Sequence, residues 1–165
     1  MPPSILAGVV HVRLVAAVLL AGGGAAWAVY ATAFGYDDYP LAWRDLTRQA
    51  GRLEFPRATG RVYRNRAALA KYLGAVMPGR APAPPAIDFT RHEALLVALG
   101  PRSSTGYDLR IVRVTERRRS IVVSAHERAP ALGEPVAARL TYPFRLLEIP
   151  RTADKRVFVE LEGRP

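Results

Sequence analysis

The stretch ALLVALGPRSSTGYDLRIVRVT, residues 94–115, carries the strongest structural signal in the chain. Residues 94–99 are all apolar, which is typical of a strand buried on both faces. Residues 107–115 alternate between apolar and polar side chains and then slip phase at Val112 and Val114, which indicates a strand with either a bulge or burial on both faces. Between the two runs lies Gly-Pro-Arg-Ser-Ser-Thr-Gly, residues 100–106. The stretch therefore predicts two strands joined by a short and well-defined loop.

Further β patterns follow this stretch, and turn residues separate them. Three arginines and a serine at residues 117–120 predict a hairpin tip with solvated side chains. Pro143 and Pro150 mark breaks, because proline cannot donate to a strand ladder. Four more strands are expected, at residues 121–126, 136–142, 145–149 and 156–161.

Helical patterns precede the β region. Asn65 can cap a helix over residues 66–77, in which the apolar side chains recur at helical spacing. Pro40 and Gly51 are placed to begin and end a shorter helix over residues 40–50. A short extended piece is expected at residues 61–64. The whole pattern predicts an α+β fold: a mostly antiparallel β sheet or small sandwich with one or two N-terminal helices.

An uncharged stretch of 21 residues, 14–34, is long enough to span a membrane as one helix. Arg13 precedes it and two aspartates follow it, which predicts that the remainder of the chain lies outside the cytoplasm. We favour an uncleaved anchor; the alternative is a signal peptide cut after Ala33, which would give a secreted protein. The expected organisation is an anchor or signal segment at 1–34, a linker with a short helix at 35–60, and a β-rich domain at 61–165.

Composition limits the classes of function. The chain has no cysteine, which excludes disulfides, thiolate metal sites and a cysteine nucleophile. Lys and Arg number 24 against 14 acidic residues, giving a net charge of +10. A surface that binds an anionic polymer or lipid is therefore one hypothesis, although no specific nucleic-acid partner is expected.

Catalytic groups are sparse in the exported part. His92 and His126 are its only histidines, and no Gly-x-Ser-x-Gly turn accompanies them. The spacings of a histidine metal site and of a glycine-rich phosphate loop are also missing. We expect no catalytic residue, no metal, no cofactor and no enzymatic activity.

The loop before residue 108 is the best candidate for a contact site. Ser104 and Thr105 carry hydroxyls that can rigidify it, and Gly106 is expected to take a positive φ. A rigid loop beside an aromatic residue, here Tyr107, binds a protein partner at low entropic cost. The alternative is an ordinary hairpin connection, with Tyr107 pointing into the core.

Several segments in a fixed order resemble the PrcB C-terminal domain family, named for a non-catalytic subunit of a bacterial surface protease complex. They are the helix before the domain, Ile87-Asp88-Phe89, the strand ending at Gly100, Ser104-Thr105-Gly106-Tyr107, the Pro130 loop, and Thr141-Tyr142-Pro143-Phe144 running into Leu147-Glu148-Ile149-Pro150. The resemblance covers roughly residues 62–151. It implies a non-catalytic domain that assembles with or stabilises an extracytoplasmic protease. Ser104, Thr105, Gly106 and Tyr107 would form the contact loop, with Tyr142 and Pro143 beside it.

A weaker resemblance concerns the same loop. Thr105-Gly106-Tyr107 matches the Thr-Gly-Tyr of the chagasin-type inhibitors of papain-like proteases, which are immunoglobulin-like β-sandwiches. The aromatic residue that follows the motif in those inhibitors is Leu109 here. This resemblance implies protease inhibition as an alternative function.

Overall fold

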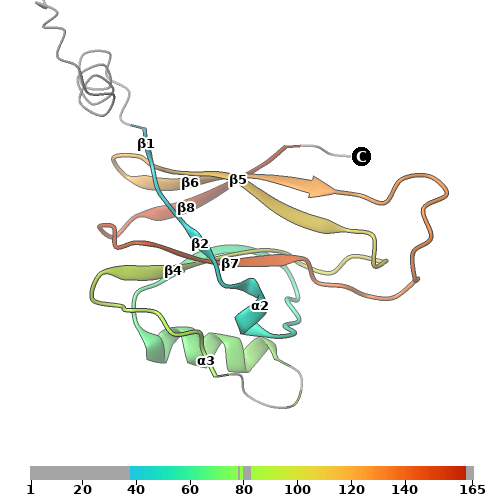
Figure 1. Ribbon diagram of the computed structural model, residues 1–165, viewed down its shortest axis with the longest axis horizontal. Helices are drawn as coiled ribbons and strands as arrows, with labels where there is room; N and C mark the ends of the chain where they lie inside the picture. The colour runs from blue at the N-terminus through green and yellow to red at the C-terminus, as the bar shows by residue number, and fades with distance from the viewer. Residues whose placement is uncertain (1–37, 78, 80–82, 163–165) are drawn as a thin grey trace, which may run out of the picture. The chain divides into compact units, whose positions relative to one another are not determined.

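The computed structural model describes residues 38–77, 79 and 83–162. The expected anchor or signal segment at 1–34 lies outside this range. Among the described residues, no helix has the length and apolar character needed to cross a membrane. The described residues form two four-stranded sheets and two helices (Figure 1). The expectation of a mostly antiparallel α+β domain with two helices is therefore confirmed.

The middle sheet has the strand order β2-β7-β4-β3, and all neighbouring strands are antiparallel. Leu95 and Leu96 of β4 point to opposite faces of this sheet, and each belongs to a different buried cluster. This two-sided burial explains why the β4 sequence is a continuous apolar run. The strands span Arg44–Asp45 (β2), Phe144–Pro150 (β7), His92–Leu99 (β4) and Ala58–Tyr63 (β3).

The outer sheet has the strand order β1-β5-β6-β8. Strand β8 runs parallel to β6, whereas the other neighbours are antiparallel. The predicted bulge is confirmed, because the register of β5 shifts between Ile111 and Arg113 and Val112 is exposed. The Arg117 amide donates to the Ser120 carbonyl at 2.7 Å, which closes the predicted hairpin tip. The strands span Tyr39–Pro40 (β1), Asp108–Glu116 (β5), Ser120–Arg128 (β6) and Arg156–Glu162 (β8).

Helix α3 spans Arg66–Val76 and covers the face of the middle sheet that points away from the outer sheet (Figure 1). The predicted cap is confirmed: Asn65 Oδ1 accepts a hydrogen bond from the Ala68 amide at 2.8 Å. Leu69 and Leu73 are fully buried beneath the helix. The domain thus has three layers in the order helix, middle sheet and outer sheet. One apolar cluster lies between the helix and the middle sheet, and the other lies between the two sheets.

Helix α2 spans only Thr47–Ala50, so the helix expected over residues 40–50 is wrong in its first part. Residues 39–40 and 44–45 instead form β1 and β2, which pair with β5 and β7. Pairing with a distant strand satisfies the backbone there, and the sequence pattern carries no sign of it. Gly51 ends the helix with φ +73°, as its position predicted.

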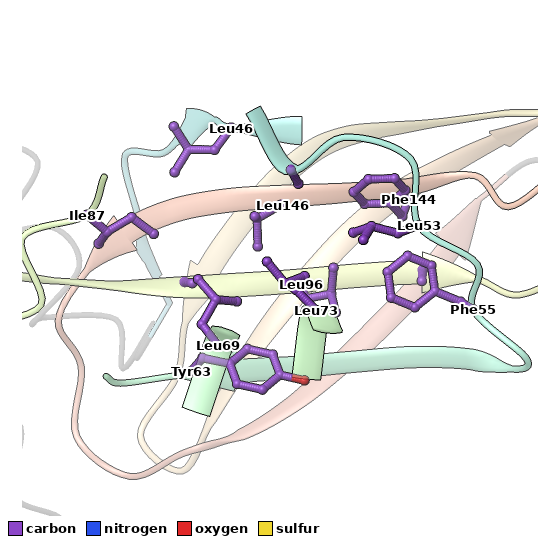
Figure 2. Close-up of a cluster of buried hydrophobic side chains, with 13 residues drawn as sticks. Leu46, Leu53, Phe55, Tyr63, Leu69, Leu73, Ile87, Leu96, Phe144 and Leu146 are labelled. Carbon is purple, nitrogen blue, oxygen red and sulfur yellow. The ribbon is translucent and has the colours of Figure 1, made fainter. Parts of the chain in front are cut away.

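The segment expected to be a linker, residues 35–60, contributes to the core. Leu46, Leu53 and Phe55 are fully buried beside α3 and β7, and Ala50 joins them. Figure 2 shows these side chains grouped with the buried residues of α3 and the middle sheet.

The strand expected at residues 136–142 is wrong. Only Thr141 forms a β-bridge there, with Arg102. Thr105 pairs with Ala137, and Arg102 pairs with Thr141. The two paired positions are three residues apart in the first segment and four residues apart in the second. This mismatch prevents a regular ladder. The segment is instead part of a long loop.

Candidate functional site

Two loops cross between the sheets at the same end of the described domain (Figure 1). Residues 100–107 lead from β4 of the middle sheet to β5 of the outer sheet. Residues 129–143 lead back from β6 to β7. We refer to the two segments together as the double loop. Because residues 100–107 change sheets, they are not the hairpin connection considered above.

Hydrogen bonds join the two halves of the double loop. Arg102 and Thr141 exchange backbone hydrogen bonds of 2.8 and 2.9 Å. The Thr105 amide donates to the Ala137 carbonyl at 3.1 Å, and the Ala137 amide donates to Thr105 Oγ1 at 3.0 Å. Thr141 Oγ1 donates to the Ser104 carbonyl at 2.7 Å. Each loop therefore supplies hydrogen-bond partners for backbone groups of the other loop. The two loops hold each other in place.

Two glycines have distinct roles in the first half of the double loop. Gly100, with φ +77°, turns the chain out of β4. The positive φ expected at Gly106 is wrong, because Gly106 is not among the described residues with that conformation. Gly106 is required by space instead: a Cβ there would lie 2.6 Å from Pro130 Cβ and 2.7 Å from Val136 Cγ1. The two halves thus approach closely enough that only glycine fits.

The Gly106→Ala variant is expected to lower the free energy of unfolding by about 1–3 kcal/mol, because the added methyl overpacks the contact between the loops. Amide hydrogen exchange at Thr105 and Ala137 should become faster, because the loops must separate. The matched control is Gly74→Ala on the exposed side of α3, where a Cβ would meet nothing within 4 Å. This control should instead raise stability by about 0.5–1 kcal/mol. Equal effects of both variants would contradict the close packing.

An ion pair braces the tip of the second half. Arg128 Nη2 donates to Glu134 Oε2 at 2.6 Å, and Arg128 Nη1 donates to the Gly106 carbonyl at 3.1 Å. Glu134 Oε2 also accepts from the Ala131 amide at 3.0 Å, and Gly133 turns the chain with φ +82°. The Arg128 hydrogen bond holds the pKa of the Glu134 carboxyl below its ordinary value. The brace is therefore present at neutral pH and is lost only in acid, as the pH falls through that lowered pKa.

A second ion pair orders the base of the first half. Arg102 donates two hydrogen bonds to Glu127, with Nε to Oε1 at 2.5 Å and Nη2 to Oε2 at 3.0 Å. These hydrogen bonds raise the pKa of the Arg102 guanidinium. The guanidinium also lies 6.0 Å from the centre of the Tyr107 ring. Tyr107 is half-buried, and its ring is within reach of a cation–π interaction with Arg102.

The structure gives the predicted contact residues different environments. Ser104 and Gly106 are buried by the second half of the double loop, whereas Thr105 is exposed. Tyr142 and Pro143 follow Thr141 directly and are half-buried. Tyr142 packs against the cluster beneath α3, and the Pro143 carbonyl accepts a hydrogen bond from the Leu99 amide at 3.0 Å. All six residues lie in the double loop, and their role in binding stays a prediction.

The most exposed apolar side chains of this region lie on the second half, at residues that sequence analysis did not name as contacts. Leu132 is 106% exposed and Leu140 is 60% exposed, and Val136 is also exposed. A pocket of about 240 Å³ borders Leu140 and Tyr142. A signal for Leu132 was present in the sequence: a large apolar residue stands next to Gly133, in a turn where polar residues are usual. The double loop therefore presents an apolar tip on a braced support.

A second pocket, of about 480 Å³, contains His92. His92 Nδ1 lies 3.5 Å from Glu148 Oε1, and Arg44 Nε donates to Glu148 Oε2 at 2.7 Å. The carboxylate already has a cationic partner, and the lining residues include no hydroxyl or thiol. His126 is exposed on β6. Within residues 38–162 as described, no three His, Asp or Glu side chains are placed to hold a metal ion.

The described residues thus form a small helix-covered β-sandwich with a hydrogen-bonded loop pair at one end. Residues 94–150, which include the whole double loop, match the model of the family described as PrcB C-terminal. This match confirms the resemblance predicted from the sequence, over about a third of the chain. No curated protein and no solved structure matches the chain.

Proposed function

We propose that the chain is a non-catalytic binding protein that assembles with or stabilises an extracytoplasmic protease through the tip of the double loop. The observation that carries the proposal is Leu132, an apolar side chain that is 106% exposed on a loop braced by Arg128 and Glu134. Exposed apolar side chains on a rigid support are typical of interaction surfaces. Little conformational entropy remains to be lost when such a loop docks.

The neighbouring residues support a protein partner. Val136 and Leu140 extend the apolar surface along the second half, and the pocket beside Leu140 and Tyr142 can accept a side chain of the partner. Arg139 lines the same pocket, which favours a partner with an acidic rim around an apolar centre. That the partner is a protease is inferred from the family alone, and its place outside the cytoplasm from the uncharged segment at 14–34.

The test is affinity capture of the tagged full chain from membranes of its own host, followed by mass spectrometry. Wild type should enrich a protease, and Leu132→Asp should lower its affinity by roughly tenfold or more, because a charge at an interface centre is costly. The matched control is Val112→Asp, which changes another exposed apolar residue on the β5 bulge. The control should capture the protease as wild type does.

Two further outcomes decide the proposal. A protease captured equally by wild type and Leu132→Asp would contradict the role of the double loop, and capture of no protease would contradict the function. Adding the purified full chain to the captured protease should then maintain or raise its proteolytic activity and extend the time for which it stays active. Loss of activity would instead indicate the inhibitor function.

A further inference from the structure

Among the described strands, β8 is the outermost strand of the outer sheet, and only one of its two edges is paired. It pairs with β6 on one side, in parallel register from Ser120↔Arg156 to His126↔Glu162. On its other side, no described strand pairs with it. Alternate backbone N–H and C=O groups of β8 therefore face outward, as a template for another strand.

The two faces of β8 differ in character. Val157 and Val159 point inward, and a Cβ on Gly60 of β3 would lie 2.7 Å from Val159 Cγ2, so this face is packed against the middle sheet. Arg156, Glu160 and Glu162 are exposed on the opposite face, and Phe158 beside them is 54% exposed. Among the described residues, neither Arg156 nor Glu162 forms an ion pair. Both charges are thus available to a neighbour across the edge.

We propose that β8 pairs antiparallel with β8 of a second copy of this chain, about a twofold axis at Val159. In this register Arg156 faces Glu162 of the second copy, and Glu162 faces Arg156, so both ends carry an ion pair. On the inward face, Val157 faces Leu161 and Val159 faces itself. On the opposite face, between the two ion pairs, Phe158 faces Glu160 of the second copy. Apolar side chains thus meet on the inward face and opposite charges meet at both ends, which is the self-complementarity that a twofold interface requires.

The basic residue at the start of β8 and the acidic residue at its end favour a second β8 strand in the antiparallel orientation. A parallel pairing in register would place Arg156 beside Arg156 and Glu162 beside Glu162, which is unfavourable. Only the antiparallel pairing brings the basic start of each strand next to the acidic end of the other, which gives two ion pairs. The two outer sheets would then form one continuous sheet across the dimer, separate from the double loop.

Charge reversal tests the proposal. The full chain is labelled with donor or acceptor dyes and titrated in dilute detergent micelles, and energy transfer between copies gives the dissociation constant. Arg156→Glu and Glu162→Arg should each weaken self-association by roughly tenfold or more, because each places like charges opposite at both ends. An equimolar mixture of the two variants should associate as wild type does, since both ion pairs are then restored in the mixed dimer.

The matched control is Arg118→Glu, which reverses an exposed cation at the β5–β6 turn. It should leave the dissociation constant unchanged. Thermal unfolding of all variants should match wild type, because the altered residues are exposed. Absence of energy transfer with wild type would overturn the proposal. So would a mixture of the two single variants that fails to associate, or transfer that neither variant weakens.

Discussion

Replacing Arg64 by methionine is expected to lower the free energy of unfolding by about 3 kcal/mol or more, because it leaves the charge of Glu93 buried without a cation. Glu93 is fully buried at the start of β4. Arg64 Nε lies 3.2 Å from Glu93 Oε2, an ionic contact rather than an aligned hydrogen bond. Thr152 supplies the remaining partners, with Oγ1 at 2.6 Å and its amide at 3.2 Å from Glu93 Oε1.

The position of Arg64 extends its effect beyond Glu93. Its Nη1 donates to Asp154 Oδ1 at 2.8 Å and its Nη2 donates to the Ala153 carbonyl at 3.0 Å. The side chain thus ties the turn between β7 and β8 to the end of β3. Its loss should loosen that turn as well as destabilise the domain.

Urea unfolding of the full chain, followed by circular dichroism in mild detergent, measures this effect. The double variant Arg64→Met/Glu93→Leu should be more stable than Arg64→Met alone, because removing both charges removes the uncompensated one. The control Arg66→Met changes an exposed arginine at the start of α3 and should shift stability by less than about 0.5 kcal/mol. A double variant that is less stable than Arg64→Met would contradict the ion-pair argument.

The elements that the sequence predicted well are those whose residues alone determine them. Strand β4 is buried on both faces and therefore reads as an unbroken apolar run. Helix α3 has a polar cap in Asn65 and an apolar face that includes Leu69 and Leu73. The bulge at Val112 was visible because an extra residue shifts the alternation.

The elements that the sequence did not predict depend on partners far along the chain. Strands β1 and β2 have two residues each, too few for a pattern, and exist because β5 and β7 lie beside them. The parallel pairing of β8 with β6 is likewise set by tertiary packing. For the same reason, the strand expected at residues 136–142 is wrong, because its pairing with residues 102–105 is irregular.

The candidate site shows the same limit. Composition singled out the loop at 104–107, and the structure places it in the double loop. Which of its side chains are exposed depends on the second half, because Pro130 and Val136 cover Gly106. The Leu132-Gly133 pair is a local sign of an apolar residue in a turn, but the full exposure of Leu132 follows from the fold of that half.

The second large effect is expected for Phe55→Ala, which should lower the free energy of unfolding by about 3–5 kcal/mol. Phe55 is 0% exposed, and Figure 2 shows its ring near that of Phe144. Its ring centre lies 5.2 Å from that of Phe144 and 6.4 Å from that of Tyr72. Removal of the ring opens a cavity between α3 and the middle sheet, and the fixed strands cannot collapse to fill it. The same urea titration of the full chain measures the loss.

This variant also tests how firmly the segment before β3 belongs to the domain. The matched control is Trp43→Ala, which removes another large aromatic ring from the same segment, at a position that is 39% exposed. Trp43→Ala should cost clearly less than Phe55→Ala, because part of its ring is already hydrated. Phe55→Leu should fall between wild type and Phe55→Ala, since it refills most of the cavity. If Phe55→Ala costs less than about 1 kcal/mol, the segment behaves as a loosely attached linker and the domain's stability rests on α3 and the two sheets.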